Sequence, residues 1–367
     1  RVTMSNESAT TFAIDNQLQA DFQTWALNHK VLFGVDGYVV NGEAFTGAGG
    51  KVPTLDYVYP VYGRGPFATP SLPGIKQKQT QYGIYLQDQI KIDRLSVLAG
   101  GRFDSALSRT RALTTGDLTK QDDTAKTGRF ALMYNFDSGI APYVSYSTSF
   151  EPVAGTTFGG SPFKPTEGEQ YEAGLKYEPP GYDALIQASV YQLTQTNVPT
   201  ADPDNVGFQI QTGEISARGF ELEARATVAE GFDLIASYAY TDAEVTKSNG
   251  VDLGRRPPVV PRHLASIWAH HTITSGQLAG LGLGLGVRYV SSGAGDAGNT
   301  FYTPGYTLVD AAISYDFGIA NASLKGWKAQ LNATNLFDRE YIAGCYGLTQ
   351  CSFGLRRTVI ATLSYRW

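Results

Sequence analysis

Side chains alternate between polar and apolar with a period of two along most of this chain of 367 residues. In the last segment, one face carries Tyr365, Leu363, Ala361 and Val359, and the other carries Arg366, Ser364, Thr362 and Thr358, with Ile360 the exception. Successive side chains of a strand point to opposite faces, so one face of this strand is compatible with lipid and the other is mostly polar. The pattern predicts a wall between hydrocarbon and a wet lumen.

The same alternation recurs in about fifteen long segments. The expected strands are residues 9–24, 28–43, 78–92, 94–108, 126–137, 140–151, 168–178, 183–196, 206–228, 231–246, 262–274, 279–292, 305–317, 326–340 and 353–367. A two-sheet sandwich is the alternative, but its strands usually have about five or six residues. The lengths favour an all-β transmembrane barrel with antiparallel, up-and-down strands.

The links between these segments alternate strictly between short and long. The short links are Asp93-Arg94, 137–139, 179–181, Glu230-Gly231 and Ser275-Gly276. The long links are 44–77, 109–125, 152–167, 197–205, 247–261, 293–304 and 341–352. Outer-membrane barrels have short periplasmic turns and long outside loops, whereas a sandwich has no reason for this alternation. The order places the C-terminus on the periplasmic side.

The composition agrees with a strand-rich membrane protein. Gly (41), Tyr (22) and Phe (18) are abundant, and only 17% of residues are charged, compared with about a quarter in ordinary globular chains. No apolar run reaches the roughly 18 residues that a spanning helix needs. The net charge of -5 and the lack of Lys/Arg clusters give no indication of nucleic-acid binding.

The strand count carries a further expectation. A spanning sheet must close on itself because unpaired backbone groups in hydrocarbon are costly, and bacterial barrels use even strand numbers. An odd count near fifteen, with no signal peptide in Arg1 to Thr10, suggests that N-terminal strands are absent from the chain. A miscount by one would instead give a closed barrel of about sixteen strands.

Several short segments, in order along the chain, carry a resemblance. They are Tyr146–Pro152, Pro165–Gly174, Arg218–Glu223, Pro258–His263 and Asn335–Tyr341. Together they resemble the strand and loop segments of TonB-dependent ferric-siderophore receptors, including the RGxExE strand, the VPxH strand start and the NLFDxxY segment. The terminal Trp367 fits the assembly signal of outer-membrane proteins, where Phe is more usual. Segments 78–81, 241–244 and 344–351 are most similar to ferrichrome and other hydroxamate-siderophore receptors.

The resemblance implies a barrel of twenty-two strands around an N-terminal plug. Residues 1–367 would then be its C-terminal part, and the plug, the TonB-contacting segment and about seven strands would be absent. The implied location is the bacterial outer membrane, and the implied activity is TonB-dependent uptake of a ferric siderophore, without enzymatic chemistry. The implied partners are the siderophore, the TonB energy complex through the missing N-terminal region, outer-membrane lipid or lipopolysaccharide, and a phage or bacteriocin.

The two cysteines, Cys345 and Cys351, lie in one outside loop with five residues between them. The compartment is oxidising, so we expect a disulfide; free thiols or a metal site are the alternatives. The resemblance places an aromatic residue after the first cysteine in the siderophore pocket, which here is Tyr346. Tyr57, Tyr59 and Phe45 are further candidates in or near loop 44–77. Their alternative role is packing of the loop or the interfacial girdle.

Other constellations indicate neither a metal centre nor catalysis. His270 and His271 are adjacent, so their side chains point to opposite faces of a strand. Glu221 and Glu223 share one strand face, which we interpret as lumen-facing charges near Arg218. Neither a catalytic residue nor a metal ligand is therefore predicted, and the only iron expected is already held in its chelator. Two rival functions are a passive porin-like channel and a surface or phage-binding barrel.

Overall fold

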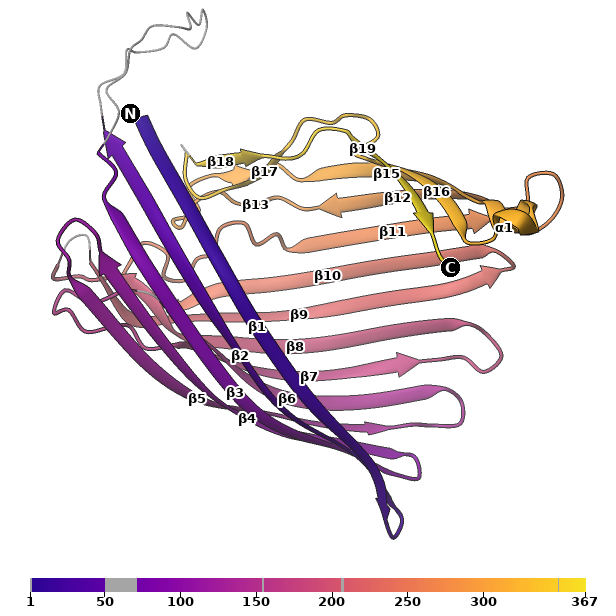
Figure 1. Ribbon diagram of the computed structural model, residues 1–367, viewed down its shortest axis with the longest axis horizontal. Helices are drawn as coiled ribbons and strands as arrows, with labels where there is room; N and C mark the ends of the chain where they lie inside the picture. The colour runs from indigo at the N-terminus through magenta and orange to yellow at the C-terminus, as the bar shows by residue number, and fades with distance from the viewer. Residues whose placement is uncertain (1, 50–70, 154, 206–207, 349) are drawn as a thin grey trace, which may run out of the picture. The chain divides into compact units, whose positions relative to one another are not determined.

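The computed structural model describes residues 2–49, 71–153, 155–205, 208–348 and 350–367, and most of them are in strands. Fifteen strands form one sheet in the order β1-β2-β3-β4-β5-β6-β7-β8-β9-β10-β11-β12-β15-β16-β19. Sheet neighbours are thus chain neighbours, as Figure 1 shows for β7 to β12. The up-and-down antiparallel order predicted from the sequence is confirmed.

The bounds of the sheet strands are β1 (Val2–Thr24), β2 (Leu27–Gly49), β3 (Gly74–Ile92), β4 (Leu95–Ala112), β5 (Leu118–Tyr134), β6 (Ile140–Glu151), β7 (Thr166–Tyr177), β8 (Ala184–Ala201), β9 (Gln209–Ala229), β10 (Phe232–Lys247), β11 (His263–Thr272), β12 (Leu281–Val290), β15 (Tyr306–Asp316), β16 (Trp327–Thr334) and β19 (Thr358–Tyr365). Two small hairpins, β13 (Gly293–Ala294) with β14 (Tyr302–Thr303) and β17 (Ile342–Cys345) with β18 (Cys351–Phe353), lie in long links.

One expected strand, residues 326–340, is wrong at its end, because β16 stops at Thr334. Asn335 and Asp338 take φ angles of 51° and 55°, in the left-handed region that a strand cannot use. The expected strand 353–367 is also too long, because β19 spans only Thr358–Tyr365. In addition, two short helices, α1 (Phe317–Ala320) and η1 (Ala322–Leu324), lie between β15 and β16. Of the helices that the structure describes, none is long and apolar enough to cross a membrane.

The short links turn because their residues accept positive φ. Asp93, Gly139 and Gly231 have φ angles of 50°, 84° and 70°. Glycine reaches this region without steric cost, and Asp and Asn reach it more readily than other residues. The sequence expectation of tight turns at one end of the strands is confirmed at these positions.

The strands fall into two compact units. Unit 1 comprises Arg1–Gln89, Ala99–Gly128 and Phe150–Pro165, and unit 2 comprises Ile90–Leu98, Arg129–Ser149 and Thr166–Trp367. In unit 2 the register pairs Leu283 with Ile313, Ile313 with Leu331, and Leu331 with Ala361. Paired residues share a face, so one apolar face continues across β12, β15, β16 and β19. We call this the apolar face of unit 2.

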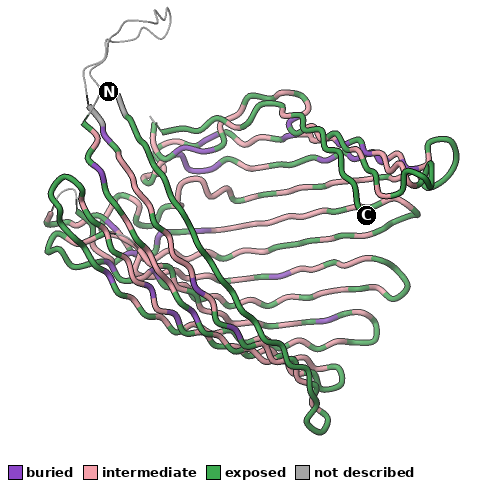
Figure 2. Tube along the Cα trace, in the orientation of Figure 1, coloured by how far each residue is buried: buried purple, intermediate pink, exposed green. Residues whose placement is uncertain are grey.

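Side chains on the apolar face are largely exposed, because a single sheet has no apolar layer against it. Figure 2 shows exposed and intermediate positions along the strands, with buried positions scattered among them. Leu285, Ile313 and Leu363 are exposed in this way. The opposite face carries polar groups such as Glu223, Lys328 and Gln330. Successive side chains of a strand point to opposite faces, so these residues lie on the side away from the apolar face. We call it the lumen face.

Aromatic rings gather near both ends of the strands in unit 2. Near the short links, ring pairs are Phe232–His271, Tyr315–Phe317 and Trp327–Tyr365. Nearer the long links, they are Tyr146–Tyr171, Tyr238–His263 and Tyr240–His263. Two aromatic levels separated by an apolar band are typical of barrels whose strands cross a membrane.

Candidate functional site

The long link between β16 and β19 carries the predicted disulfide. Cys345 and Cys351 are bonded to each other and face each other across the β17–β18 hairpin. The Cys345 side chain is buried, with 1% of its surface exposed. The backbone N–H of Tyr346 donates to the carbonyl of Gln350 at 3.0 Å, which closes the hairpin tip. The disulfide and this bond together join the two sides of the hairpin.

Tyr346 projects from this tip and is 70% exposed. Its backbone is held by the disulfide of the preceding residue, Cys345, and by the hydrogen bond from its own N–H to Gln350. An exposed ring on a fixed backbone presents apolar area and a hydroxyl group at small entropic cost. The residue therefore has the properties of a ligand contact at the long-link end of unit 2.

The hairpin rests on two other long links. A Cβ atom at Gly344 would lie 2.8 Å from the side chain of Val259, so only glycine permits this approach. The Val259 N–H donates to the Ala294 carbonyl at 3.3 Å. Asn299 then joins the same two links, since its Nδ2 donates to the Arg256 carbonyl at 2.8 Å and its Oδ1 accepts from the Arg256 N–H at 3.1 Å.

Buried side chains gather in the long links and in the strand ends next to them. In unit 2 they include Val245, Ala294, Thr303, Leu308 and Cys345. Leu308 is 2% exposed although it belongs to the lumen face of β15. We call this group the loop core.

Asn335 connects the loop that carries Tyr346 to the wall. Its N–H donates to Asp310 Oδ1 at 2.8 Å, and Arg288 Nη2 donates to the same oxygen at 3.0 Å. Its Nδ2 donates to the carbonyls of Arg339 at 2.8 Å and Leu355 at 3.1 Å. Its Oδ1 accepts from the Arg339 N–H at 2.8 Å. One buried amide therefore organises both ends of the loop that carries Tyr346.

A sequence-family model described as the β-barrel of TonB dependent receptor-like proteins matches residues 2–336. The chain belongs to this family. The family consists of outer-membrane receptors and transporters rather than enzymes, as expected from the sequence.

Relatives of this TonB-dependent receptor chain cover it almost from end to end. The ferrichrome outer membrane transporter/phage receptor of Escherichia coli is 39% identical over 100% of this chain and 50% of its own length. The ferrioxamine B receptor of Salmonella typhimurium is 40% identical over 98% of this chain and 51% of its own. The chain thus spans about half the length of the curated relatives it matches.

The fold also matches solved receptors. The siderophore receptor PiuA from Acinetobacter baumannii has a TM-score of 0.80, with 20% identity, over 98% of this chain and 56% of that one. The likeness concerns the fold, and it supports the predicted barrel architecture.

Of the other predicted ligand residues, the structure describes Phe45, in unit 1. Phe45 is half-buried on β2 and lies close to Gly74, where an added Cβ would be 2.5 Å from its ring. By register and period it shares the face of β2 that carries Phe33 and Val39. Tyr57 and Tyr59 lie outside the residues that the structure describes. The roles of Phe45, Tyr57, Tyr59 and Tyr346 in ligand binding stay predictions.

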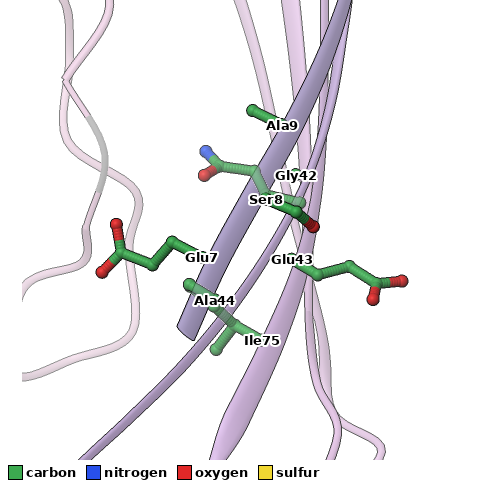
Figure 3. Close-up of a pocket in the computed structure, with 8 residues that line it drawn as sticks. Glu7, Ser8, Ala9, Gly42, Glu43, Ala44 and Ile75 are labelled. Carbon is green, nitrogen blue, oxygen red and sulfur yellow. The ribbon is translucent and has the colours of Figure 1, made fainter. Parts of the chain in front are cut away.

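Unit 1 holds two shallow grooves. The first, of about 300 Å³, is lined by Glu7, Ser8, Ala9, Gly42, Glu43, Ala44, Ile75 and Gln77. Figure 3 shows the side chains of Glu7 and Glu43 pointing to opposite sides, and Glu43 accepts a hydrogen bond from Lys76 at 2.8 Å. The second groove, of about 280 Å³, is lined by Lys78, Thr80, Tyr82, Ser105, Leu107, Arg109 and Asp122. It combines two cations, one carboxylate and an aromatic ring.

The histidines and acidic pairs behave as ordinary wall residues. His271 pairs with Leu283 on the apolar face, whereas His270 lies beside Gly282 on the lumen face, so the predicted opposition is confirmed. Within the described ranges, no group of three or more His, Cys, Asp or Glu side chains is placed to hold a metal ion. Glu221 and Glu223 share the lumen face.

The sequence analysis placed Arg218 near the lumen-facing charges Glu221 and Glu223 but did not predict which face of the strand Arg218 occupies. By the strand period it lies on the face opposite Glu221 and Glu223, the apolar face, and it pairs with Asp242 of β10. Both segments 218–223 and 241–244 carry the family resemblance, but their amino-acid sequences do not show that they are paired. The strand register supplies that information.

Proposed function

We propose that this chain forms the wall and mouth of an outer-membrane receptor that takes up a ferric siderophore of the hydroxamate type. The observation that carries the proposal is the identity of 39% and 40%, over essentially the whole chain, to relatives whose names refer to ferrichrome and ferrioxamine B. Both of these ligands are iron complexes of hydroxamates. In this proposal a plug domain and further strands belong to the same receptor outside these 367 residues.

The mouth is suited to a compact and nearly neutral complex. A ferric hydroxamate presents apolar edges and carbonyl-type oxygens, and Tyr346 offers a ring and a hydroxyl group to match them. The disulfide and the loop core fix the backbone below this ring before any ligand arrives. Such preorganisation lowers the entropic cost of binding. Iron enters already chelated, so no protein ligand to the metal is needed.

Passage requires energy from elsewhere, which we assign to the TonB complex acting on the plug. The test is uptake of radioactive iron by cells that lack their own siderophore receptors and produce this protein. Ferrichrome, ferrioxamine B and ferric citrate are compared, with and without TonB. Saturable uptake of the two hydroxamates at nanomolar concentration, dependent on TonB, is expected. Uptake that rises linearly with concentration and ignores TonB would support a passive channel instead.

We assign outer-leaflet lipid as a second partner of unit 1. The groove of Lys78, Tyr82 and Arg109 combines cationic groups with an aromatic ring, as phosphorylated lipid headgroups above acyl chains require. Replacing Lys78 and Arg109 with glutamine should reduce the lipopolysaccharide that copurifies with the protein. Unchanged copurification would contradict this assignment.

A phage or bacteriocin is a further candidate ligand for the outer loops. The E. coli relative is named as a phage receptor, and the hairpin of this chain exposes Leu348 and Phe353 to 81% and 80%. Shortening residues 346–350 should abolish adsorption of a phage that uses this protein. Adsorption that survives this change would exclude the hairpin as the docking point.

A further inference from the structure

The first groove of unit 1 lies against Gly42, a glycine that its strand does not require. β2 pairs with β1 residue by residue from Leu27 to Gly49, so Gly42 forms no bulge. Its φ lies outside the left-handed region. Of the residues that the structure describes, an added Cβ would meet Ser8 alone, 3.6 Å from its carbonyl oxygen, which is an ordinary contact. Alanine would therefore fit here without strain.

Three other glycines of β2 each make room for a close neighbour. An added Cβ would come within 3.0 Å of another atom at Gly34, Gly37 and Gly47. Glycine weakens the interior of a strand, and it often marks a bulge or a place where another backbone or a ligand approaches closely. Within the described part of unit 1, Gly42 has neither a bulge nor such a neighbour. The approach of a ligand accounts for this glycine.

The groove is lined by three neighbouring strands (Figure 3). Ala9 of β1, and Gly42 and Ala44 of β2, are small, and they leave a volume of about 300 Å³ unfilled. Ile75 of β3, 41% exposed, adds apolar area. Glu7 of β1 adds a carboxylate. The groove thus combines an apolar surface with a single charge at its side.

Glu7 lies on the polar face of unit 1. By the strand period it shares one face of β1 with Asp15, whereas the opposite face carries the exposed side chains of Phe12, Ile14 and Leu18. A polar interior and an apolar outer band are typical of barrels that cross a membrane. The face that carries Glu7 therefore lines the lumen.

The groove lies beyond the level of the lipid. On the outer face of β1, the three positions that follow Phe12 towards the long link are polar: Thr10, Ser8 and Asn6. Strands rise about 3.3 Å per residue and tilt by about 40°, so Glu7 lies roughly 13 Å beyond Phe12 along the membrane normal. Both faces of β1 are wet at this level. A ligand dissolved in water can therefore reach the groove.

Negative charge exceeds positive charge around Glu7. From the middle of the described strands β1 to β4 up to the long links, the polar face carries Glu7, Asp15, Asp36 and Asp104, and one cation, Arg102. Arg102 is engaged by its neighbours, because its Nη2 donates to Asp36 Oδ1 at 2.8 Å and its Nε donates to Asp104 Oδ2 at 2.7 Å. The ion pairs among the described residues do not include Glu7. A cationic group is the ligand that Glu7 favours.

We propose that the groove binds a protonated primary amine on the arm of a hydroxamate siderophore, so that Glu7 selects cationic siderophores over neutral ones. The inference rests on the proposed function and adds a specificity site to it. The ammonium group would donate to the carboxylate of Glu7 and to the amide oxygen of Gln77, and the alkyl part of the arm would lie against Ile75. The small side chain of Gly42 leaves the space for this arm.

The test compares three iron complexes on the full-length receptor, purified in detergent at neutral pH. Ferrioxamine B carries a free arm that ends in a primary amine, N-acetylated ferrioxamine B has the same arm without the charge, and ferrichrome has no such arm. Affinities are measured by quenching of tryptophan fluorescence. The wild type should bind ferrioxamine B about three- to fivefold more tightly than its acetylated form at low salt. High salt should remove this preference, because exposed charges are screened.

Two substitutions separate the charge from the space. Glu7→Gln should remove the preference for the charged arm. Gly42→Leu should weaken binding of both complexes that carry an arm, and Gly42→Ala should do so less. Bound ferrichrome shows in each case that the receptor is folded. The matched control is Asp21→Asn, which removes a carboxylate from the same face of β1 near the short link and should leave the preference unchanged.

Equal binding of ferrioxamine B and its acetylated form by the wild type would overturn the inference, as would a preference that survives Glu7→Gln. Loss of the preference in Asp21→Asn would also overturn it, because the effect would then come from the general field of the lumen. In these cases uptake of hydroxamates stands. If none of the three complexes binds, the proposed function itself is wrong. The salt dependence of the wild-type preference tests the charge even if a variant does not fold.

Discussion

Asp338 accepts two hydrogen bonds from the guanidinium group of Arg356, at 2.9 Å from Nε and 2.7 Å from Nη2. The backbone N–H of Arg357 adds a third at 2.8 Å, and Glu340 accepts from Arg356 as well. These contacts join the turn after β16 to the start of β19. The loop that carries Tyr346 is therefore closed at its base by Arg356 and two carboxylates, of which Asp338 makes the most contacts.

This closure should depend on pH. The hydrogen bonds from the Arg356 side chain, and then that from the Arg357 N–H, lower the pKa of Asp338 below its ordinary value of 3.8. Because the folded-state pKa is depressed, the stabilisation is fully present above pH 3.8 and is lost as the pH falls towards the folded value. Hydrogen exchange of the amides of Arg339 and Arg357, corrected for intrinsic rates, should speed up in that range.

The control for this prediction is Asp338→Asn, which removes the titrating group. Its amides should exchange faster at neutral pH, and their protection should no longer change as the pH falls below 3.8. If the wild type and the variant respond identically to acid, another carboxylate is responsible.

Asn335→Ala should destabilise the loop by about 2–3 kcal/mol, because buried hydrogen bonds to Arg339 and Leu355 are lost. Alanine must also adopt the φ of 51° that Asn335 has. Asn335→Gly accepts this angle without strain, so the difference between the two variants measures the backbone part. Urea unfolding followed by limited proteolysis of the loop gives both values. Equal stability of the alanine variant and the wild type would refute the role of the amide.

Tyr346→Ala should weaken binding of ferrichrome roughly tenfold, since an aromatic contact and its hydroxyl partner are removed. The matched control is Leu348→Ala, in the same hairpin and similarly exposed. Equilibrium binding to the full-length protein is measured by quenching of its tryptophan fluorescence. A loss that is equal in both variants would indicate a general disturbance of the loop rather than a ligand contact.

Gly284→Ala should displace the indole ring of Trp268, which extends from β11 over Gly284 of β12 on the lumen face. An added Cβ would lie 2.3 Å from the indole ring, closer than any relaxed contact. Either the ring moves or the strand shifts, at a cost of about 1–3 kcal/mol. Tryptophan emission should change, together with the urea midpoint. Gly101→Ala is the control, because nothing lies within 4 Å of its added Cβ, and it should alter neither signal.

The strands and their faces were predictable because one physical signal, the period of two, operates along each of them. Strand 140–151 was located to the residue. The end of β16 was not, because Asn335, Leu336 and Phe337 continue the composition of a strand while Asn335 turns into the left-handed region. Backbone geometry of this kind depends on the buried partners of the amide, which come from Arg339 and Leu355.

The candidate sites divide in the same way. The disulfide follows from local spacing and compartment, and the structure contains it. The ion pairs of Asp242 with Arg218 and Arg256 depend on the register of β9 against β10 and on a loop reaching back to Asp242, which are relations between distant parts of the chain. The period of two places Arg218 on the face opposite Glu221 and is visible in the sequence, but the pairing of Arg218 with Asp242 is not.

The loop core has a consequence for how such proteins diversify. Leu308, Ala294 and Cys345 are buried by the protein itself, whereas the wall depends on acyl chains to cover its apolar side chains. Substitutions in the loop core are therefore limited by packing within the protein, and substitutions on the apolar face are limited by contact with lipid. A mouth can be rebuilt for a new cargo by altering residues that never meet the bilayer, and the strands beneath it need not be retuned.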